Sequence, residues 1–299
     1  MSYQSEAQLE LQLQNDIVRK GFGYVEIKNK EDMIKNFRDT LIKFNKEILA
    51  LDFSEIHEMR QGDLLVFAAQ IEKSITTNRN KIIRKGALPK TKSIRKLLTK
   101  VDNVFHINKP INIPEVSNAE KENLLNPTLI DNIVNDLKKI GIKEYYYPFN
   151  VFLTELIGNA VEHGIENRKI NWWLTSEVDN KNRIAKYTFV DMGLGIISSH
   201  KKAGLPWKYY FKNSIQILLG ALSGELGSST KESNRGKGLP QLRDMIVKEN
   251  VSDLILITND VSLNFKNGSF VVRRNPNFVG TYYSWTIDHN NYQIWKNSQ

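Results

Sequence analysis

The 299-residue chain contains no cysteine, and this absence limits how its fold can be held together. Disulfide scaffolds, thiolate zinc sites, iron–sulfur clusters and cysteine nucleophiles are all excluded. Hydrophobic residues make up 40% of the chain and charged residues 25%, which are ordinary values for globular proteins. The fold must therefore depend on buried apolar side chains, and the length of the chain favours two domains.

Hydropathy and charge limit where the protein acts and what it binds. The chain has no apolar run of the about 18 residues that a membrane span needs, and its first residues, MSYQSEAQLELQLQ, are polar. We therefore expect a cytoplasmic protein with no membrane partner. The net charge of +9 suits a polyanionic partner. Lysine-rich surfaces are common, however, so charge alone does not predict nucleic-acid binding.

Changes in sequence pattern divide the chain into five segments. Apolar residues at helical spacing predict a helical extension over residues 1–46. Short strand and helix patterns predict a small α/β domain over residues 47–106. Prolines among polar residues predict a linker over residues 107–117, followed by a larger domain over 118–288 and a tail over 289–299.

The small domain is predicted to alternate between strands and helices. Strands are expected at residues 48–53 and 81–84, because these stretches are short and apolar. Helices are expected at residues 64–71 and 91–101, because apolar residues recur there every three or four positions.

The segment PFNVFLTELIGNAVEHG, residues 148–164, is typical of a helix with one apolar face. Glu155 and Asn159 are four residues apart, so they lie one above the other. A helical wheel places Asn159 within or beside the apolar stripe. A polar group buried without a partner costs roughly 2–7 kcal/mol. The pair therefore holds a metal ion, a water or a ligand, or else lies at the edge of the stripe and reaches solvent.

A strand with a polar end is predicted over residues 184–191. Asp191 ends this strand on the same face as bulky apolar residues, because side chains alternate between the two faces. The sequence DMGLG then places Gly193 and Gly195 directly after it. These glycines predict either an ordinary turn or a close approach of the backbone to a ligand.

A second glycine-rich turn precedes a predicted helix. Gly236 and Gly238 flank Lys237, and the helix begins near Leu239. Free backbone N–H groups and the helix dipole favour an anion at such a position, and Arg235 adds positive charge. Without a ligand, the same pattern is an ordinary helix entry.

Further strands are predicted at residues 170–175, 254–257, 268–274 and 280–287. A turn is predicted at residues 179–182, and Thr281 places a hydroxyl at the start of the final strand. Residues 198–233 contain a helical stripe, Ile215, Leu218, Leu219 and Leu222, and their glycine- and serine-rich end predicts either a mobile lid or a plain surface loop.

The order and spacing of these motifs resemble those of the GHKL superfamily, the ATPases of gyrase, heat-shock chaperone, histidine-kinase and mismatch-repair proteins. Its N-box is similar to Glu155-x-x-x-Asn159-Ala160, its G1 box to Asp191-x-Gly193-x-Gly195, its G2 box to Gly236-x-Gly238-Leu239, and its closing pair to Gly280-Thr281. The resemblance covers residues 118–288. It implies a Bergerat ATP-binding fold, an α+β two-layer sandwich with a mixed sheet covered by helices on one face.

The resemblance also implies ATP and Mg²⁺ as cofactors and a role for each motif residue. Glu155 would be the general base, and Asn159 would coordinate Mg²⁺. Asp191 would accept a hydrogen bond from the adenine amino group, with assistance from Thr281. The backbone at Gly193 and Gly195 would approach the base and ribose, and the phosphates would be held by Arg235, Gly236, Lys237, Gly238 and Leu239.

Within the superfamily, residues 154–164 are similar to the N-box of anti-sigma-factor serine kinases. Residues 48–71 resemble the STAS domain of anti-sigma-factor antagonists, which partner such kinases. The resemblance implies a regulatory protein serine/threonine kinase or an ATPase switch. Its partner would be a protein akin to a sigma factor or an antagonist, and the chain could form a homodimer. The expected STAS phosphoacceptor turn, Arg60-Gln61-Gly62, has no hydroxyl, so phosphorylation at that site is not expected.

Two other functions compete with this interpretation. Residues 56–60, IHEMR, resemble the start of a histidine-kinase H-box, but Gln61-Gly62-Asp63 replaces the usual Thr-Pro-Leu, so a histidine kinase would be degenerate. Alternatively, the ATP site could control a regulator that lacks kinase activity and binds a protein or a nucleic acid. The basic residues that would favour nucleic acid are Lys81, Arg84, Lys85, Lys90, Lys92, Arg95, Lys96 and Lys100.

Overall fold

The computed structural model describes residues 23–26, 48–60, 62–67, 69–70, 82–85, 89–99, 127–163, 172–227, 238–266 and 269–299. The chain divides into two compact units, Met1–Pro114 and Glu115–Gln299, and the division falls within the expected linker over residues 107–117. No helix within the described ranges is long and apolar enough to cross a membrane.

The first unit contains a parallel sheet of three short strands. These are β1 (Gly23–Glu26), β2 (Ile48–Asp52) and β3 (Ile82–Lys85), with β2 in the middle. The strands expected at residues 48–53 and 81–84 are confirmed to within a residue. The mainly helical extension expected over residues 1–46 contains one described strand, because β1 pairs with β2 along its whole length. The apolar spacing that predicted the helix lies outside the described residues.

Helices follow the second and third strands of this sheet. Residues 62–67 and 69–70 are helical, and α4 (Lys92–Thr99) lies within the range predicted for the last helix. The edge of the Phe67 ring packs against Phe53, with the ring centroids 5.1 Å apart. A helix is the usual connection between two neighbouring parallel strands such as β2 and β3. The chain must return from the end of the first strand to the edge of the sheet where the second strand begins.

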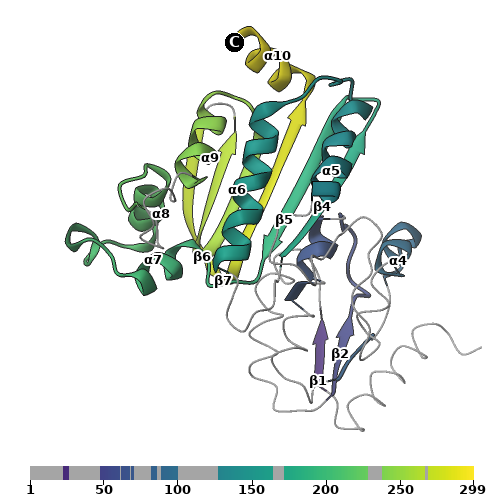
Figure 1. Cartoon of the computed structure of the whole chain (residues 1–299). Helices are drawn as coiled ribbons and strands as arrows, with labels where there is room; N and C mark the ends of the chain where they lie inside the picture. Colours follow the sequence, from purple (N-terminus) through teal and green to yellow (C-terminus); the bar gives the residue numbers. More distant parts are fainter. Residues whose placement is uncertain are drawn as a thin grey trace, which may run out of the picture. The chain divides into compact units, whose positions relative to one another are not determined.

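The second unit is built on a four-stranded sheet with the order β4-β5-β7-β6 (Figure 1). The strands are β4 (Trp172–Asp179), β5 (Ile184–Asp191), β6 (Ser252–Lys266) and β7 (Ser269–Asp288). Every pair in this sheet is antiparallel, so the prediction of a mixed sheet is wrong for the described strands. The predicted turn at residues 179–182 is confirmed, with the Asp179 carboxylate accepting hydrogen bonds from the backbone of Lys181 and Asn182.

The last two predicted strands, 268–274 and 280–287, are parts of one continuous strand, β7. Pro276 lies between these two ranges and cannot donate a hydrogen bond to a neighbouring strand. The pairing of β6 with β7 shifts register between Asn259 and Val261, opposite this part of β7. Because β7 is continuous, Thr281 lies inside a strand rather than at its start.

Helices α5 (Pro127–Lys139), α6 (Tyr147–His163) and α9 (Gly238–Val247) cover one face of this sheet (Figure 1). The core between the layers combines aliphatic side chains with several aromatic rings. The ring of Phe149 lies 4.8 Å from that of Tyr187, and the ring of Phe152 lies 4.7 Å from that of Trp285. A mixed α and β architecture, with helices packed on one face of a sheet, is thus confirmed for this unit.

Three further helical elements complete the second unit: α7 (Ile196–Ala203), η2 (Trp207–Tyr209) and α8 (Ser214–Leu222). Helix α8 contains the apolar residues whose helical spacing was predicted, Ile215, Leu218, Leu219 and Leu222. The glycine- and serine-rich end, for which a lid or a loop was predicted, lies beyond Gly227 and outside the described residues.

The tail expected over residues 289–299 is instead a helix, α10 (His289–Asn297). A capping box between Asp288 and Asn291 begins it. The rings of Tyr292 and Trp295 in this helix pack against the ring of Tyr146.

Candidate functional site

A row of three polar side chains crosses the sheet where β5 ends. Asp191 of β5 is paired directly with Thr281 of β7, and Thr281 is paired with Thr258 of β6. Directly paired residues project to the same face of a sheet. We call Asp191, Thr281 and Thr258 the polar row. Both threonines are buried and Asp191 is half-buried, so the row is set into the unit.

Helix α6 passes over the face of the sheet that carries the polar row. Its Phe149 ring contacts Tyr187 of β5, and its Phe152 ring approaches Tyr283 of β7 at 6.5 Å. Tyr187 and Tyr283 lie an even number of positions from the polar row, so they share its face. From Phe149 to Phe152, helix α6 therefore runs toward the polar row. A rise of 1.5 Å per residue carries it about 10 Å beyond Phe152 at Asn159, near the end of the strands.

Glu155 and Asn159 of α6 meet the beginning of α9. A methyl group built on Gly238 would lie 2.5 Å from Glu155 Oε2 and 3.1 Å from Asn159 Nδ2. No larger side chain fits there without displacing these groups, so the backbone at Gly238 lies directly against the pair. The Glu155 and Asn159 side chains are both half-buried. This burial is intermediate between the two alternatives that the sequence left open, a pair that holds a ligand and a pair that reaches solvent. Two of the predicted motifs are thus brought together by the packing of α6 on α9.

The other residues of the second glycine-rich motif are only partly described. Leu239 is half-buried in the first turn of α9 and packs against the core. Arg235, Gly236 and Lys237 lie outside the described residues.

The turn after β5 is held close to the polar row. The Asp191 carboxylate accepts a hydrogen bond from the Gly193 N–H at 2.9 Å. Gly195 has φ 79°, and a methyl group on it would lie 2.8 Å from the carbonyl oxygen of Gly280. Gly280 itself has φ 99°, and a methyl group there would overlap the carbonyl oxygen of Asp191 at 1.9 Å. These glycines permit a backbone approach that no side chain allows.

Thr258 and Asn259 anchor this turn, and sequence reasoning did not identify either residue. Thr258 Oγ1 accepts a hydrogen bond from the Ile196 N–H at 2.9 Å. Asn259 Oδ1 accepts from the Ile197 and Ser198 N–H groups, and its Nδ2 donates to the Leu194 carbonyl and to Ser198 Oγ; those distances run from 2.8 to 3.3 Å. The first N–H groups of α7 are therefore capped by side chains of β6.

A local signal for Asn259 was present in the sequence. The residue adopts φ 49°, in the left-handed region that asparagine tolerates better than most residues. An asparagine interrupting the apolar pattern of a strand therefore indicates a special backbone position. Nothing in the local sequence reveals that its amide reaches the turn after β5.

The negative charge of Asp191 affects the pKa of a buried tyrosine on the same face of the sheet. Burial, together with the negative charge of Asp191, raises the pKa of Tyr283 far above its ordinary value, so this hydroxyl stays protonated. Within the described ranges, no group of three or more His, Cys, Asp or Glu side chains could hold a metal ion.

Comparison with models of protein families gave no match, and comparison with curated proteins gave none.

Proposed function

We propose that the second unit is a GHKL-type, Bergerat-fold domain that binds ATP with Mg²⁺. One observation carries the proposal: the motifs of four separate elements converge at one end of the helix-covered sheet face. Asp191 and Thr281 are paired in the sheet, the turn after β5 approaches Gly280, and Gly238 lies against Glu155 and Asn159. Close backbone approaches combined with half-buried polar groups fit a site for a polar ligand.

The proposed residue roles follow from the chemistry of each group. Asp191 would accept a hydrogen bond from an exocyclic amino group of the base, and the Thr281 hydroxyl would assist beside it. Asn159 would contribute an amide oxygen to Mg²⁺, which is a hard cation and prefers oxygen ligands. Glu155 would accept a proton from a water or a substrate hydroxyl. Bound Mg²⁺ would supply charge neutralisation for the phosphates.

The phosphates would be held at the beginning of α9. Backbone N–H groups at a helix N-terminus favour an anion, and Gly238 keeps this backbone close to Glu155 and Asn159. Arg235, Gly236, Lys237 and Leu239 would complete this part of the site. The charge of the two basic residues complements the phosphates.

The reaction we propose is transfer of the γ-phosphoryl group to a serine or threonine of a partner protein, or hydrolysis that drives a switch. The first unit supports a regulatory role, because it has the order strand, helix, strand, helix around a parallel sheet, as a STAS-like domain would. The described helix after β2 begins at Gly62, and neither Gly62 nor Arg60 carries a hydroxyl. The unit would therefore dock a partner or a second copy rather than accept phosphate at that position.

Nucleotide binding is tested by isothermal titration of the full chain with a nonhydrolysable ATP analogue, with and without Mg²⁺. Asp191→Asn is expected to weaken binding about tenfold, because the charge-assisted hydrogen bond from the amino group becomes a weaker bond to a neutral amide oxygen. Asp179→Asn is the matched control, because Asp179 lies at the other end of the same β4–β5 hairpin. Absence of binding, or equal loss in both variants, would refute the proposed site.

The chemistry is tested by incubation with Mg²⁺ and γ-labelled ATP, with and without cell extract. Label on a serine or threonine of an extract protein would indicate a kinase, and label released as inorganic phosphate alone would indicate an ATPase switch. Glu155→Ala is expected to lower turnover by roughly 10²–10⁴ with binding retained, if Glu155 is the base. Asn159→Ala is expected to remove the dependence of affinity on Mg²⁺.

A further inference from the structure

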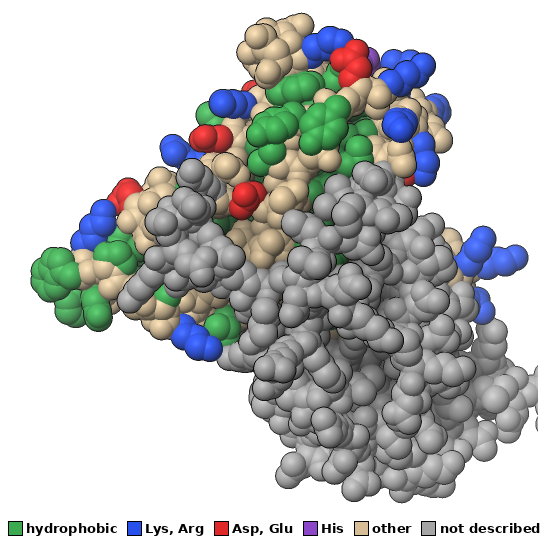
Figure 2. Space-filling model, viewed as in Figure 1, with side chains coloured by type: hydrophobic (Ala, Val, Ile, Leu, Met, Phe, Trp, Pro, Cys, Tyr) green, Lys and Arg blue, Asp and Glu red, His purple; other side chains and the backbone are tan. Residues whose placement is uncertain are grey.

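The connection between α7 and α8 exposes three large aromatic side chains within five residues. The exposed fractions are 80% for Trp207, 66% for Tyr210 and 91% for Phe211. We call these three residues the aromatic tip. In Figure 2, hydrophobic side chains gather at the far left, where Figure 1 shows the α7–α8 region. A group of exposed apolar side chains on a protein surface marks a contact site.

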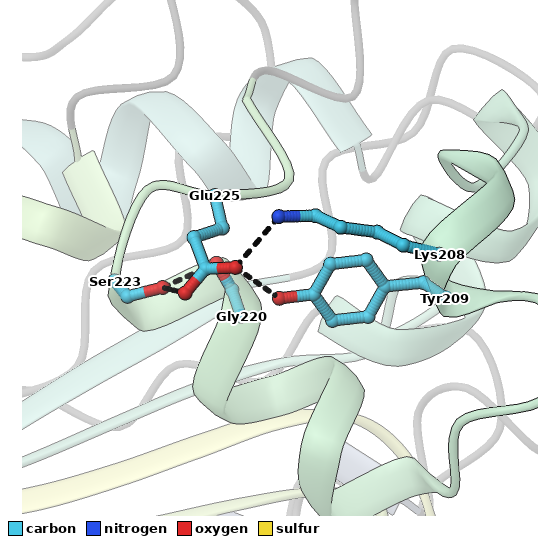
Figure 3. Close-up of polar contacts among 5 residues, drawn as sticks. All are labelled: Lys208, Tyr209, Gly220, Ser223 and Glu225. Carbon is cyan, nitrogen blue, oxygen red and sulfur yellow. Dashed lines mark hydrogen bonds and ion pairs between the residues drawn. The ribbon is translucent and has the colours of Figure 1, made fainter.

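The aromatic tip is held in place by its buried neighbour, Tyr209. The Tyr209 hydroxyl donates a hydrogen bond to Glu225 Oε2 at 3.0 Å, and Lys208 Nζ donates to the same oxygen at 2.8 Å (Figure 3). The ring lies so close to Gly220 that a methyl group there would be 2.3 Å from the Tyr209 hydroxyl oxygen. With Tyr209 fixed, the residues on either side of it are directed outward. The tip is therefore preorganised, which lowers the entropic cost of docking.

Along the sequence, the charged residues around the tip are mainly lysines. Between Asp191 and Glu225 the sequence contains no Asp or Glu. The same stretch contains four lysines, all exposed, which are Lys201, Lys202, Lys208 and Lys212. The one carboxylate at the end of this stretch, Glu225, is engaged by Lys208 and Tyr209. An apolar surface surrounded by lysines complements a partner with an apolar interior and an anionic boundary.

We propose that the aromatic tip docks the protein onto the surface of an anionic membrane. Trp and Tyr rings favour the interface between hydrocarbon and water, because one end of the ring system is apolar and the other polar. Lysines beside them are attracted to anionic lipid headgroups. A bilayer accepts a convex projection without a matching cavity. Single-stranded nucleic acid, by contrast, is bound along a charged groove that follows its backbone.

This contact differs from the membrane span that the sequence excludes. The expectation of no membrane partner rested on hydropathy over the length of a spanning helix, and such a search does not detect a short peripheral contact. The inference is also independent of nucleotide binding, since none of the residues of the tip belongs to the proposed ATP site.

The test is flotation of the full-length, nucleotide-free protein with two kinds of vesicle. One contains phosphatidylcholine alone, and the other contains phosphatidylcholine with phosphatidylglycerol. Binding to the anionic vesicles and not to the neutral ones is expected. The double variant Trp207→Ala/Phe211→Ala is expected to reduce this binding by about tenfold or more, because the rings supply its apolar part.

Matched variants separate the tip from general effects. Tyr145 and Tyr147 are exposed by 64% and 58% on another part of the unit, so Tyr145→Ala/Tyr147→Ala should leave vesicle binding unchanged. Lys201→Gln and Lys212→Gln should each reduce binding about fivefold, whereas Lys248→Gln, on the exposed end of α9, should not. Unchanged thermal unfolding of each variant confirms that its fold is intact.

Three results would overturn the proposal. The first is failure of the wild-type protein to float with anionic vesicles. The second is equal loss in the Tyr145/Tyr147 control, which would show that no specific surface is involved. The third is binding to a single-stranded oligonucleotide that is lost in the Trp207/Phe211 variant while vesicle binding is unaffected, which would assign the tip to nucleic acid.

Discussion

Replacing Gly280 by alanine tests the close approach between β5 and β7 beside the polar row. Gly280 has φ 99°, and a methyl group on its Cα would lie 1.9 Å from the carbonyl oxygen of Asp191. The neighbouring atoms are backbone, namely the Asp191 carbonyl carbon at 2.8 Å and the Met192 Cα at 2.9 Å. Backbone held in a paired sheet cannot move aside as the end of a flexible side chain does. The strands must therefore separate locally.

Two costs add in this variant. A residue with Cβ in the left-handed region costs about 1–2 kcal/mol. Forcing an extra methyl group into a well-packed position costs about 1–3 kcal/mol more. Gly280→Ala should therefore lower the free energy of unfolding of the second unit by about 2–5 kcal/mol, a large part of the 5–15 kcal/mol typical of a domain.

Two other glycines separate these contributions. Gly141 has φ 93°, but a methyl group on it would have no neighbouring atom within 4 Å, so Gly141→Ala should cost only the about 1–2 kcal/mol of backbone strain. Gly158 lies in α6 with open space around it and ordinary backbone angles. Gly158→Ala should therefore stabilise the unit by up to about 1 kcal/mol, the helix preference of alanine over glycine.

The assay is urea unfolding followed by tryptophan fluorescence. All five tryptophans lie at or beyond residue 172, so the signal reports the second unit alone. Equal destabilisation by Gly280→Ala and Gly141→Ala would refute the reasoning, because the clash would then contribute nothing. A loss of nucleotide affinity without loss of stability in Gly280→Ala would instead assign the glycine to ligand contact.

Three further predictions concern the supports of the site and the tip. Asn259→Ala should destabilise the turn after β5 by about 1–3 kcal/mol, because buried N–H groups lose their acceptor, and urea unfolding would show a smaller loss for Asn259→Asp, which keeps the acceptor. Phe152→Ala should cost about 3–5 kcal/mol in the same assay, and less than 1 kcal/mol would contradict its burial between α6 and the sheet. The hydrogen bonds from Lys208 and Tyr209, and the charge of Lys208, hold the pKa of Glu225 below its ordinary value of 4.5. The ionised Glu225 carboxylate therefore stabilises the fold above pH 4.5, and this stabilisation is lost as the pH falls through the lower pKa of the folded state. Urea midpoints of wild type and Glu225→Gln should therefore differ at neutral pH and converge in acid, and a difference that persists in acid would refute this role for the ion pair.

Elements with a strong local pattern were predicted from the sequence. The helix over residues 148–164 has an apolar face that repeats over several turns, and α6 occupies this range to within a residue. The turn at residues 179–182 has the Asp and Asn residues that hydrogen-bond their own backbone, and the structure shows these bonds. In both cases the chemistry that decides the structure lies within the segment itself.

Elements that depend on distant contacts were missed. The strand β1 has four residues, and its pairing with β2 cannot be inferred from GYVE alone. Helix α10 is polar along most of its length and packs on Tyr146 through two aromatic side chains. Its capping box at Asp288 and Asn291 was readable, but a box without an apolar repeat behind it is a weak signal.

The glycines of the site show why motifs locate a site but do not explain it. The sequence left Gly195 open between an ordinary turn and a close approach to a ligand, and Gly238 between an anion site and an ordinary helix entry. The structure shows that each is required by another part of the protein: Gly195 by Asn259 and Gly280, and Gly238 by Glu155 and Asn159. Their absent side chains allow segments far apart in the chain to come together, and the polar groups converge as a result. The spacing of the motifs indicates which glycines are important, whereas the segments that contact them are determined by the tertiary fold.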